Sequence, residues 1–123
     1  MYHVFTAMLA VSRIPNTKAS AENSEFQLNI ADLKPGCVVK FGRRVDGSPI
    51  DVSFNSNVVS RSHCEISMDD DKKVYLKDIG SSTGTFLNDK KLEIGQPAEI
   101  CQNDIVQLGM DAGAHKAVKI RIL

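Results

Sequence analysis

The sequence has no excess charge of either sign, because 15 lysines and arginines balance 15 aspartates and glutamates. A balanced chain gains no long-range attraction to nucleic acid or to an anionic membrane surface. We therefore expect neither of these partners. Any anion-binding site must be a local arrangement of cations and hydrogen-bond donors.

Cysteine is also scarce. The three cysteines, Cys37, Cys64 and Cys101, are odd in number and far apart, which is not the pattern of a disulfide framework. Glycosylation sequons of the form N-x-S/T are absent. Both features favour a reducing compartment, so we expect an intracellular protein of the nucleus, the cytoplasm or both.

The apolar run at residues 1–11 ends before Arg13 and Pro15. It is too short to cross a bilayer, and it lacks the basic start of a signal peptide. We expect an opening strand in this run, followed by a polar surface loop at residues 15–24.

Helical patterns are missing as well. We find no convincing helical stretch with apolar residues at i, i+3, i+4 and i+7, whereas short β-rich runs separated by turn residues dominate. The 123 residues predict one domain, 1–123, large enough to fold without a disulfide or a metal. The expected strands are His3–Val11, Glu25–Ile30, Val38–Phe41, Asp51–Phe54, His63–Met68, Val74–Asp78, Thr85–Leu87, Ala98–Ile100, Ile105–Leu108 and Ala117–Ile122.

Several of these runs alternate between apolar and polar residues. Val118, Ile120 and Ile122 alternate with Lys119 and Arg121, which predicts a strand with one buried and one solvated face. About ten to eleven short strands joined by turns predict an all-β sandwich with mainly antiparallel pairing. Loops that converge at one end of such a sandwich would form a ligand site there.

Three segments between expected strands are rich in groups that suit a phosphate, namely 41–43 (FGR), 60–63 (SRSH) and 80–85 (GSSTGT). Arginine offers bidentate contacts, and serine and threonine offer hydroxyl donors. Glycine lets backbone N–H groups approach an anion closely. Loops of this composition also serve as ordinary turns, so composition alone leaves both interpretations open.

The segments FGR, SRSHCEI and DIGSSTGTFLN resemble, in order and spacing, the GR, SxxH and SSxGTxxN motifs of forkhead-associated (FHA) domains. The resemblance covers residues 25–123. Within them, the segments VVSRSHCEI and SSTGTFLN are similar to FHA domains of fungal and animal cell-cycle and signalling proteins, including some joined to RING ubiquitin ligases. The resemblance implies a binding module without catalysis; we expect no cofactor, and a monomer as the default state of the isolated domain. Such a module binds phosphothreonine in a partner protein and prefers it to phosphoserine.

The resemblance also implies a role for individual residues. The phosphopeptide-binding positions are Arg43, Ser60, Arg61, Ser82 and Thr83. The loop-structuring positions are Gly42, His63, Gly84, Thr85 and Asn88. Many family members have asparagine where this chain has Thr83, and that asparagine holds the peptide main chain. With threonine, this grip is either weaker or supplied by another loop residue such as Asn57.

Catalytic and metal-binding alternatives have weaker support. Ser60, His63 and Asp78 contain the residue types of a hydrolase triad, but the G-x-S-x-G nucleophile elbow is absent. A metal site lacks its usual ligand pairs, because the sequence has no C-x-x-C or H-x-x-H spacing. We therefore expect neither catalysis nor a bound metal.

Two further motifs are incomplete. The GSSTGT segment lacks the lysine and the following helix of a nucleotide-binding loop, and the acidic residues 69–71 lack the spacing of a calcium-binding EF-hand. A module that binds partners through a sandwich face, independently of phosphate, stays open as an alternative function.

Overall fold

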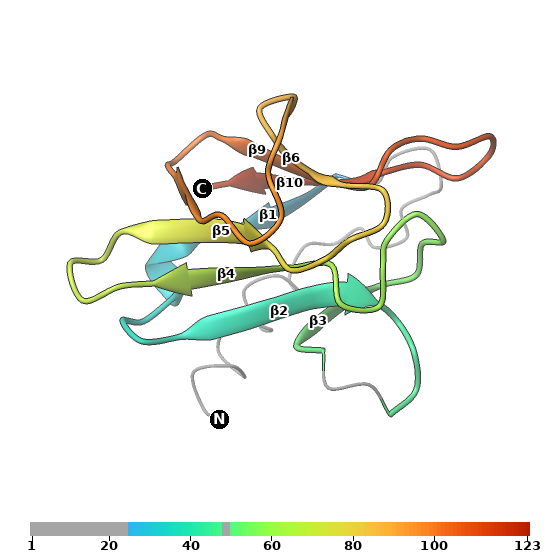
Figure 1. Cartoon of the computed structure of the whole chain (residues 1–123). Helices are drawn as coiled ribbons and strands as arrows, with labels where there is room; N and C mark the ends of the chain where they lie inside the picture. Colours follow the sequence, from blue (N-terminus) through green and yellow to red (C-terminus); the bar gives the residue numbers. More distant parts are fainter. Residues whose placement is uncertain (1–24, 48–49) are drawn as a thin grey trace.

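The computed structural model describes residues 25–47 and 50–123. These residues form a sandwich of two five-stranded sheets (Figure 1), as the sequence predicts. The opening strand and the polar loop expected over residues 3–11 and 15–24 lie outside the described residues. No helix in the described part is long and apolar enough to cross a membrane.

We call the two layers sheet A and sheet B. Sheet A has the strand order β1 (Glu25–Leu28), β10 (Val118–Ile122), β9 (Ile105–Leu108), β6 (Thr85–Leu87) and β7 (Lys90–Lys91). Sheet B has the order β3 (Val52–Phe54), β2 (Val38–Arg43), β4 (Cys64–Met68), β5 (Val74–Asp78) and β8 (Ala98–Ile100). The β1–β10 and β2–β3 pairs are parallel and the other pairs are antiparallel, so the predicted mainly antiparallel pairing is confirmed.

Most strand boundaries agree with the sequence pattern, and the differences have local causes. Strand β1 ends at Leu28, because the Asn29 side chain accepts the Ala31 N–H at 2.9 Å and caps a short 3-10 helix, η2 (Ile30–Asp32). Strand β7 was not predicted, since its two lysines show no apolar alternation. Strand β7 forms only because these two residues pair with β6.

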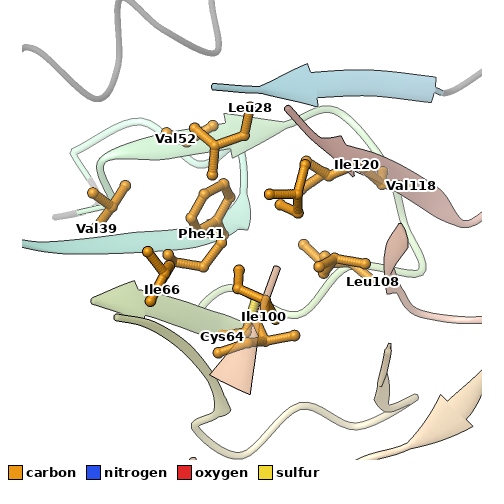
Figure 2. Close-up of a cluster of buried hydrophobic side chains, with 14 of the residues drawn as sticks. Leu28, Val39, Phe41, Val52, Cys64, Ile66, Ile100, Leu108, Val118 and Ile120 are labelled. Carbon is orange, nitrogen blue, oxygen red and sulfur yellow. The ribbon is translucent and has the colours of Figure 1, made fainter. Parts of the chain in front are cut away.

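Apolar side chains from both sheets meet in one core (Figure 2). The ring of Phe54 from sheet B lies 5.0 Å from Phe26 of sheet A and 6.3 Å from Phe41 of its own sheet. Such packing makes the layers a rigid support for the loops at their ends. Figure 2 labels Leu28, Val39, Phe41, Val52, Cys64, Ile66, Ile100, Leu108, Val118 and Ile120.

Strand β5 contains one polar exception to this core. Val74 and Leu76 are buried while Tyr75 and Lys77 are half-buried, which is the alternation expected of a strand with one face in the core. The next inward position is Asp78, a carboxylate with 1% exposure. A buried carboxylate needs hydrogen-bond partners, and these partners lie in the loop that follows.

Candidate functional site

Three loops gather at one end of the sandwich, on the right in Figure 1. They join β3 to β4 (residues 55–63), β5 to β6 (79–84) and β9 to β10 (109–117). The N–H of Gly109 donates to the carbonyl oxygen of Gly84 at 2.9 Å and fastens the second loop to the third. Segments far apart in the sequence therefore form one surface.

The end of β2 lies against the first of these loops. The N–H of Arg43 donates to the carbonyl oxygen of Ser60 at 2.9 Å, and the N–H of His63 donates to that of Phe41 at 3.0 Å. The Arg43 side chain is half-buried and that of Arg61 is exposed. Neither forms an ion pair with a carboxylate of the described residues. Both guanidinium groups are thus available to an anion.

Gly42 allows this close approach of β2 and the loop. A β-carbon at this position would collide with the carbonyl oxygen of Arg61 and would lie 3.2 Å from Cδ1 of Ile50. The backbone of Gly42 is not in the left-handed conformation that favours glycine. Glycine is therefore required here because there is no space for a side chain. A larger residue would push the Arg61 backbone away from the strand.

Two hydroxyl groups meet beside Arg43. The N–H of Ser82 donates to Oγ of Ser60 at 2.9 Å, and the two Oγ atoms are 3.0 Å apart. Ser60 is half-buried and Ser82 is exposed. A single hydroxyl proton occupies the contact between the two oxygens, so the second proton can be donated to an anion.

The buried ring of His63 links two of the loops through hydrogen bonds. Its buried ring accepts the N–H of Ser60 at Nδ1, 3.0 Å away, and Nε2 lies 2.8 Å from the carbonyl oxygen of Gly84. Because Nδ1 accepts, the proton must be on Nε2, which donates to Gly84. Burial lowers the pKa of His63, against the opposing effects of Gly84 and of the Asp78 charge. The His63 imidazole that links the two loops is therefore neutral.

Asp78 organises the loop between β5 and β6. Its carboxylate accepts the N–H groups of Gly80 and Ser81 at 2.7 and 2.8 Å, and also the Ser81 hydroxyl at 2.5 Å. That hydroxyl in turn accepts the N–H of Gly84 at 3.0 Å. Burial alone would raise the pKa of Asp78, but these hydrogen bonds outweigh it and lower the pKa.

The sequence did not reveal this role of Asp78 and Ser81. The sequence feature that could have indicated this role is an aspartate at the end of a strand, followed two and three residues later by a glycine and a serine. An aspartate there can accept the N–H groups that follow it. The neighbouring Thr85 hydroxyl is buried and has no hydrogen-bond partner among the described residues, yet it is near enough to Asp78 to contribute to the lowered pKa.

The Thr83 hydroxyl points into the protein. It donates to the carbonyl oxygen of Val58 at 2.7 Å. Gly109 lies beneath this contact, because a β-carbon there would collide with the Val58 carbonyl and lie 3.1 Å from the Thr83 oxygen. The single proton of Thr83 thus ties two loops together. The exposed Asn57 lies in the first of them.

Asn88 is placed away from these loops. Its side-chain oxygen accepts the N–H of Ile105 at 2.9 Å, and its side-chain nitrogen donates to Asp104 at 3.1 Å. These contacts shape the turn between β6 and β7, at the opposite end of β6 from Gly84. Asn88 therefore structures a different turn from the one that carries Ser82.

The catalytic and metal alternatives find no geometric support in the described part of the chain. Both ring nitrogens of His63 bond to the backbone, so neither engages the Ser60 hydroxyl or the Asp78 carboxylate. A charge-relay triad needs both of those contacts. Within residues 25–47 and 50–123, no three histidine, cysteine or acidic side chains gather as metal ligands.

Comparison with known proteins identifies the family. The profile of the FHA domain matches residues 39–109. The chain belongs to the FHA family. The membership predicted from the three loop motifs is thus confirmed.

Two curated relatives and one solved structure illustrate the similarity. The chain is 36% identical over 98 residues to an uncharacterized Schizosaccharomyces pombe protein, covering 72% of this chain and 33% of that one. It is 38% identical over 88 residues to the probable E3 ubiquitin-protein ligase dma1 of the same yeast, with coverages of 67% and 33%. The matched region therefore spans about a third of these relatives.

The structure resembles the N-terminal FHA domain of Saccharomyces cerevisiae Rad53p, solved in complex with a phosphothreonine peptide. The TM-score is 0.57 at 26% identity, and 75% of each chain is covered.

Proposed function

We propose that this FHA domain binds phosphothreonine in a partner protein and thereby joins the two proteins after phosphorylation. One observation carries the proposal: the hydroxyls of Ser60 and Ser82 lie 3.0 Å apart, beside the end of the strand that carries Arg43. A phosphothreonine brings nearly two negative charges and three acceptor oxygens. The Arg43 guanidinium complements the charge, and the two serine hydroxyls can donate to the acceptor oxygens.

Arg43 and the hydroxyls have complementary tasks. The guanidinium supplies charge-assisted hydrogen bonds to phosphate oxygens, and the hydroxyls of Ser60 and Ser82 supply short, directional ones. His63 and Asp78 fix the loops before a ligand arrives, through hydrogen bonds of 2.5 to 3.0 Å. A site ordered in advance loses less conformational entropy on binding.

The proposed activity is binding without chemistry. The S. pombe relative is named as a probable ubiquitin ligase, but the matched region covers only a third of it. We assign to this chain the recognition step alone, in the nucleus or cytoplasm, where phosphorylated partners are made. Any catalytic activity of a longer protein would belong to another part.

The proposal is tested by selecting a ligand from an oriented phosphothreonine peptide library. The selected sequence is then made with phosphothreonine, with phosphoserine and without phosphate, and each form is titrated calorimetrically. We expect binding to require the phosphate and to be stronger for phosphothreonine. Equal binding of the unphosphorylated peptide would instead support the phosphate-independent module.

A pair of neighbouring arginines provides matched variants. Arg43→Ala should weaken phosphopeptide binding by about 2–4 kcal/mol, because it leaves the phosphate underpaired. Arg44→Ala removes an exposed arginine one residue further along the chain and should leave affinity almost unchanged. Equal losses in both variants would mean a diffuse charge effect and would remove Arg43 from the site.

A further inference from the structure

Sheet A has a charge asymmetry that the phosphate site does not explain. Its strands β6, β7, β9 and β10 contain four charged residues, and all of them are basic. The whole chain is neutral, so this region is locally positive. The four residues are Lys90, Lys91, Lys119 and Arg121.

Two of these cations belong to one row across the sheet. The register places Lys91 opposite Phe86, Phe86 opposite Gln107, and Gln107 opposite Lys119. Residues directly opposite on antiparallel strands share a face, and the flanking Thr85 is buried on the other face. The two lysines are exposed, and Phe86 and Gln107 are half-buried. We call this row of four residues the basic ladder.

The ladder begins at the phosphate-binding loop. A β-carbon on Gly84 would lie 3.0 Å from Cε of Lys91 and 3.2 Å from the ring of Phe86. The lysine stem therefore packs over the loop, and standard bond lengths place its ammonium within about 6 Å of the Gly84 α-carbon. Gly84 is itself fixed by Ser81 and His63.

The Lys91 charge is open to a ligand. No described carboxylate lies within 4.0 Å of its ammonium, and no acidic residue stands opposite it in the register. The positive charge of Lys91, at the end of the ladder that touches the phosphate-binding loop, is therefore not compensated by a described carboxylate.

Gln107 joins the middle of the ladder to the same end of the sandwich. Its side-chain nitrogen donates to the carbonyl oxygen of Gly109 at 2.8 Å, and Gly109 is bonded to Gly84. A peptide that leaves the phosphate site over Gly84 therefore meets Lys91 first, and then the Phe86 ring.

We propose that the basic ladder binds an acidic stretch of the partner adjoining the phosphothreonine. This inference rests on the proposed function and adds the chemistry of the flanking sequence. The ladder crosses three interstrand spacings, roughly 14 Å, which about four extended residues span. Acidic residues closest to the phosphothreonine meet Lys91, and one about four residues further along reaches Lys119.

The test uses phosphothreonine peptides of equal length with neutral flanks, with acidic residues before the phosphothreonine, or with acidic residues after it. Fluorescence anisotropy measures their binding to the wild-type chain, Lys91→Gln and Lys90→Gln. Lys90 is the matched control, because it is an exposed lysine of the same strand that stands opposite Leu87 and so on the other face.

We expect the wild type to bind one of the two acidic peptides about two- to five-fold more tightly than the neutral one, and less so at high salt. Lys91→Gln should remove most of this preference and bind the neutral peptide as the wild type does. Lys90→Gln should retain the preference. The side of the phosphothreonine that gives the gain shows the direction in which the peptide runs.

Failure of this inference differs from failure of the proposed function. If the wild type binds the neutral peptide in an Arg43-dependent way but Lys91→Gln keeps the acidic preference, only the ladder is excluded. If no phosphothreonine peptide binds, the proposed function itself fails. A single-stranded oligonucleotide that binds through Lys91 more tightly than any acidic peptide would overturn the choice of a peptide as the occupant.

Discussion

The hydroxyl of Thr83 donates its proton to the carbonyl oxygen of Val58, 2.7 Å away. This contact ties the loop that carries Ser82 to the loop that carries Ser60. The family asparagine at this position holds the peptide main chain, whereas the threonine proton is already used inside the protein. Thr83 therefore orders the two loops, and its hydroxyl proton is not available to a peptide carbonyl.

Replacing Thr83 tests this ordering role. Thr83→Val keeps the shape but leaves the Val58 carbonyl without its donor, which should cost about 1–2 kcal/mol of stability and weaken phosphopeptide binding several-fold. Thr83→Ser keeps the hydroxyl and should restore most of both. Urea unfolding and peptide titration measure the two effects. A valine variant that equals the wild type in both would show that the contact is dispensable.

The buried imidazole of His63 should make stability depend on pH. Its pKa is lowered in the folded state, so the unfolded chain takes up a proton more readily. The stabilisation is therefore complete above the unfolded pKa of about 6.5 and is lost as the pH falls below it, by at most about 1.4 kcal/mol per pH unit. Urea unfolding between pH 7.5 and 5 measures this slope.

Two glutamine variants separate His63 from other titrating groups. His63→Gln cannot titrate and should flatten the slope, although it destabilises the chain at neutral pH. His115→Gln changes an exposed histidine and should leave the slope unchanged. The free energy of unfolding reports on His63 more clearly than peptide affinity does, because the phosphate of the peptide itself titrates near pH 6. An unchanged slope in His63→Gln would assign the pH dependence to another group.

Much of this site could be predicted from sequence, because its strands are strongly patterned and its loops are rich in glycine and serine. Strands β5, β6, β8 and β9 begin and end at the predicted residues. Strand β7 could not be found, since it is a product of pairing and not of its own two lysines. Asp78 was also missed as a loop organiser, because its role depends on burial that only the packed sheet creates.

Contacts between loops are the part that sequence reasoning could not supply. The segments around Arg43 and Ser60 were expected at one end of the sandwich, but nothing in the sequence indicated that Thr83 bonds to Val58. Likewise, the placement of Lys91 over Gly84 follows from the β6–β7 register. Neither contact has a local sequence signature.

Gly42 should tolerate no side chain. In Gly42→Ala the new methyl group collides with the Arg61 carbonyl, which should cost about 1–3 kcal/mol of stability, as other cases of overpacking do. Phosphopeptide binding should fall as well, since the segment that carries Ser60 is displaced. Thermal unfolding and peptide titration measure both effects.

Lys40→Ala is the control for Gly42→Ala. It changes an exposed residue two positions earlier on the same face of β2 and should alter neither property strongly. If Gly42→Ala proved as stable as Lys40→Ala, the loop could move away from β2 at little cost. The close approach would then not be needed for the site.

Ser60→Ala should separate the phosphate contact from the fold. The variant removes the hydroxyl that we propose as a donor to the phosphate, and it also removes the acceptor of the Ser82 N–H. We therefore expect a loss of about 1.5–3 kcal/mol in phosphopeptide binding, as for hydrogen bonds to charged groups. Stability should fall less, because Ser82 is exposed and water can replace the lost acceptor. Ser62→Ala alters an exposed serine of the same loop and should leave binding unchanged. Equal affinities of Ser60→Ala and Ser62→Ala would mean that the phosphate lies elsewhere, and the pairing of Ser60 with Ser82 would then serve only to hold the two loops together.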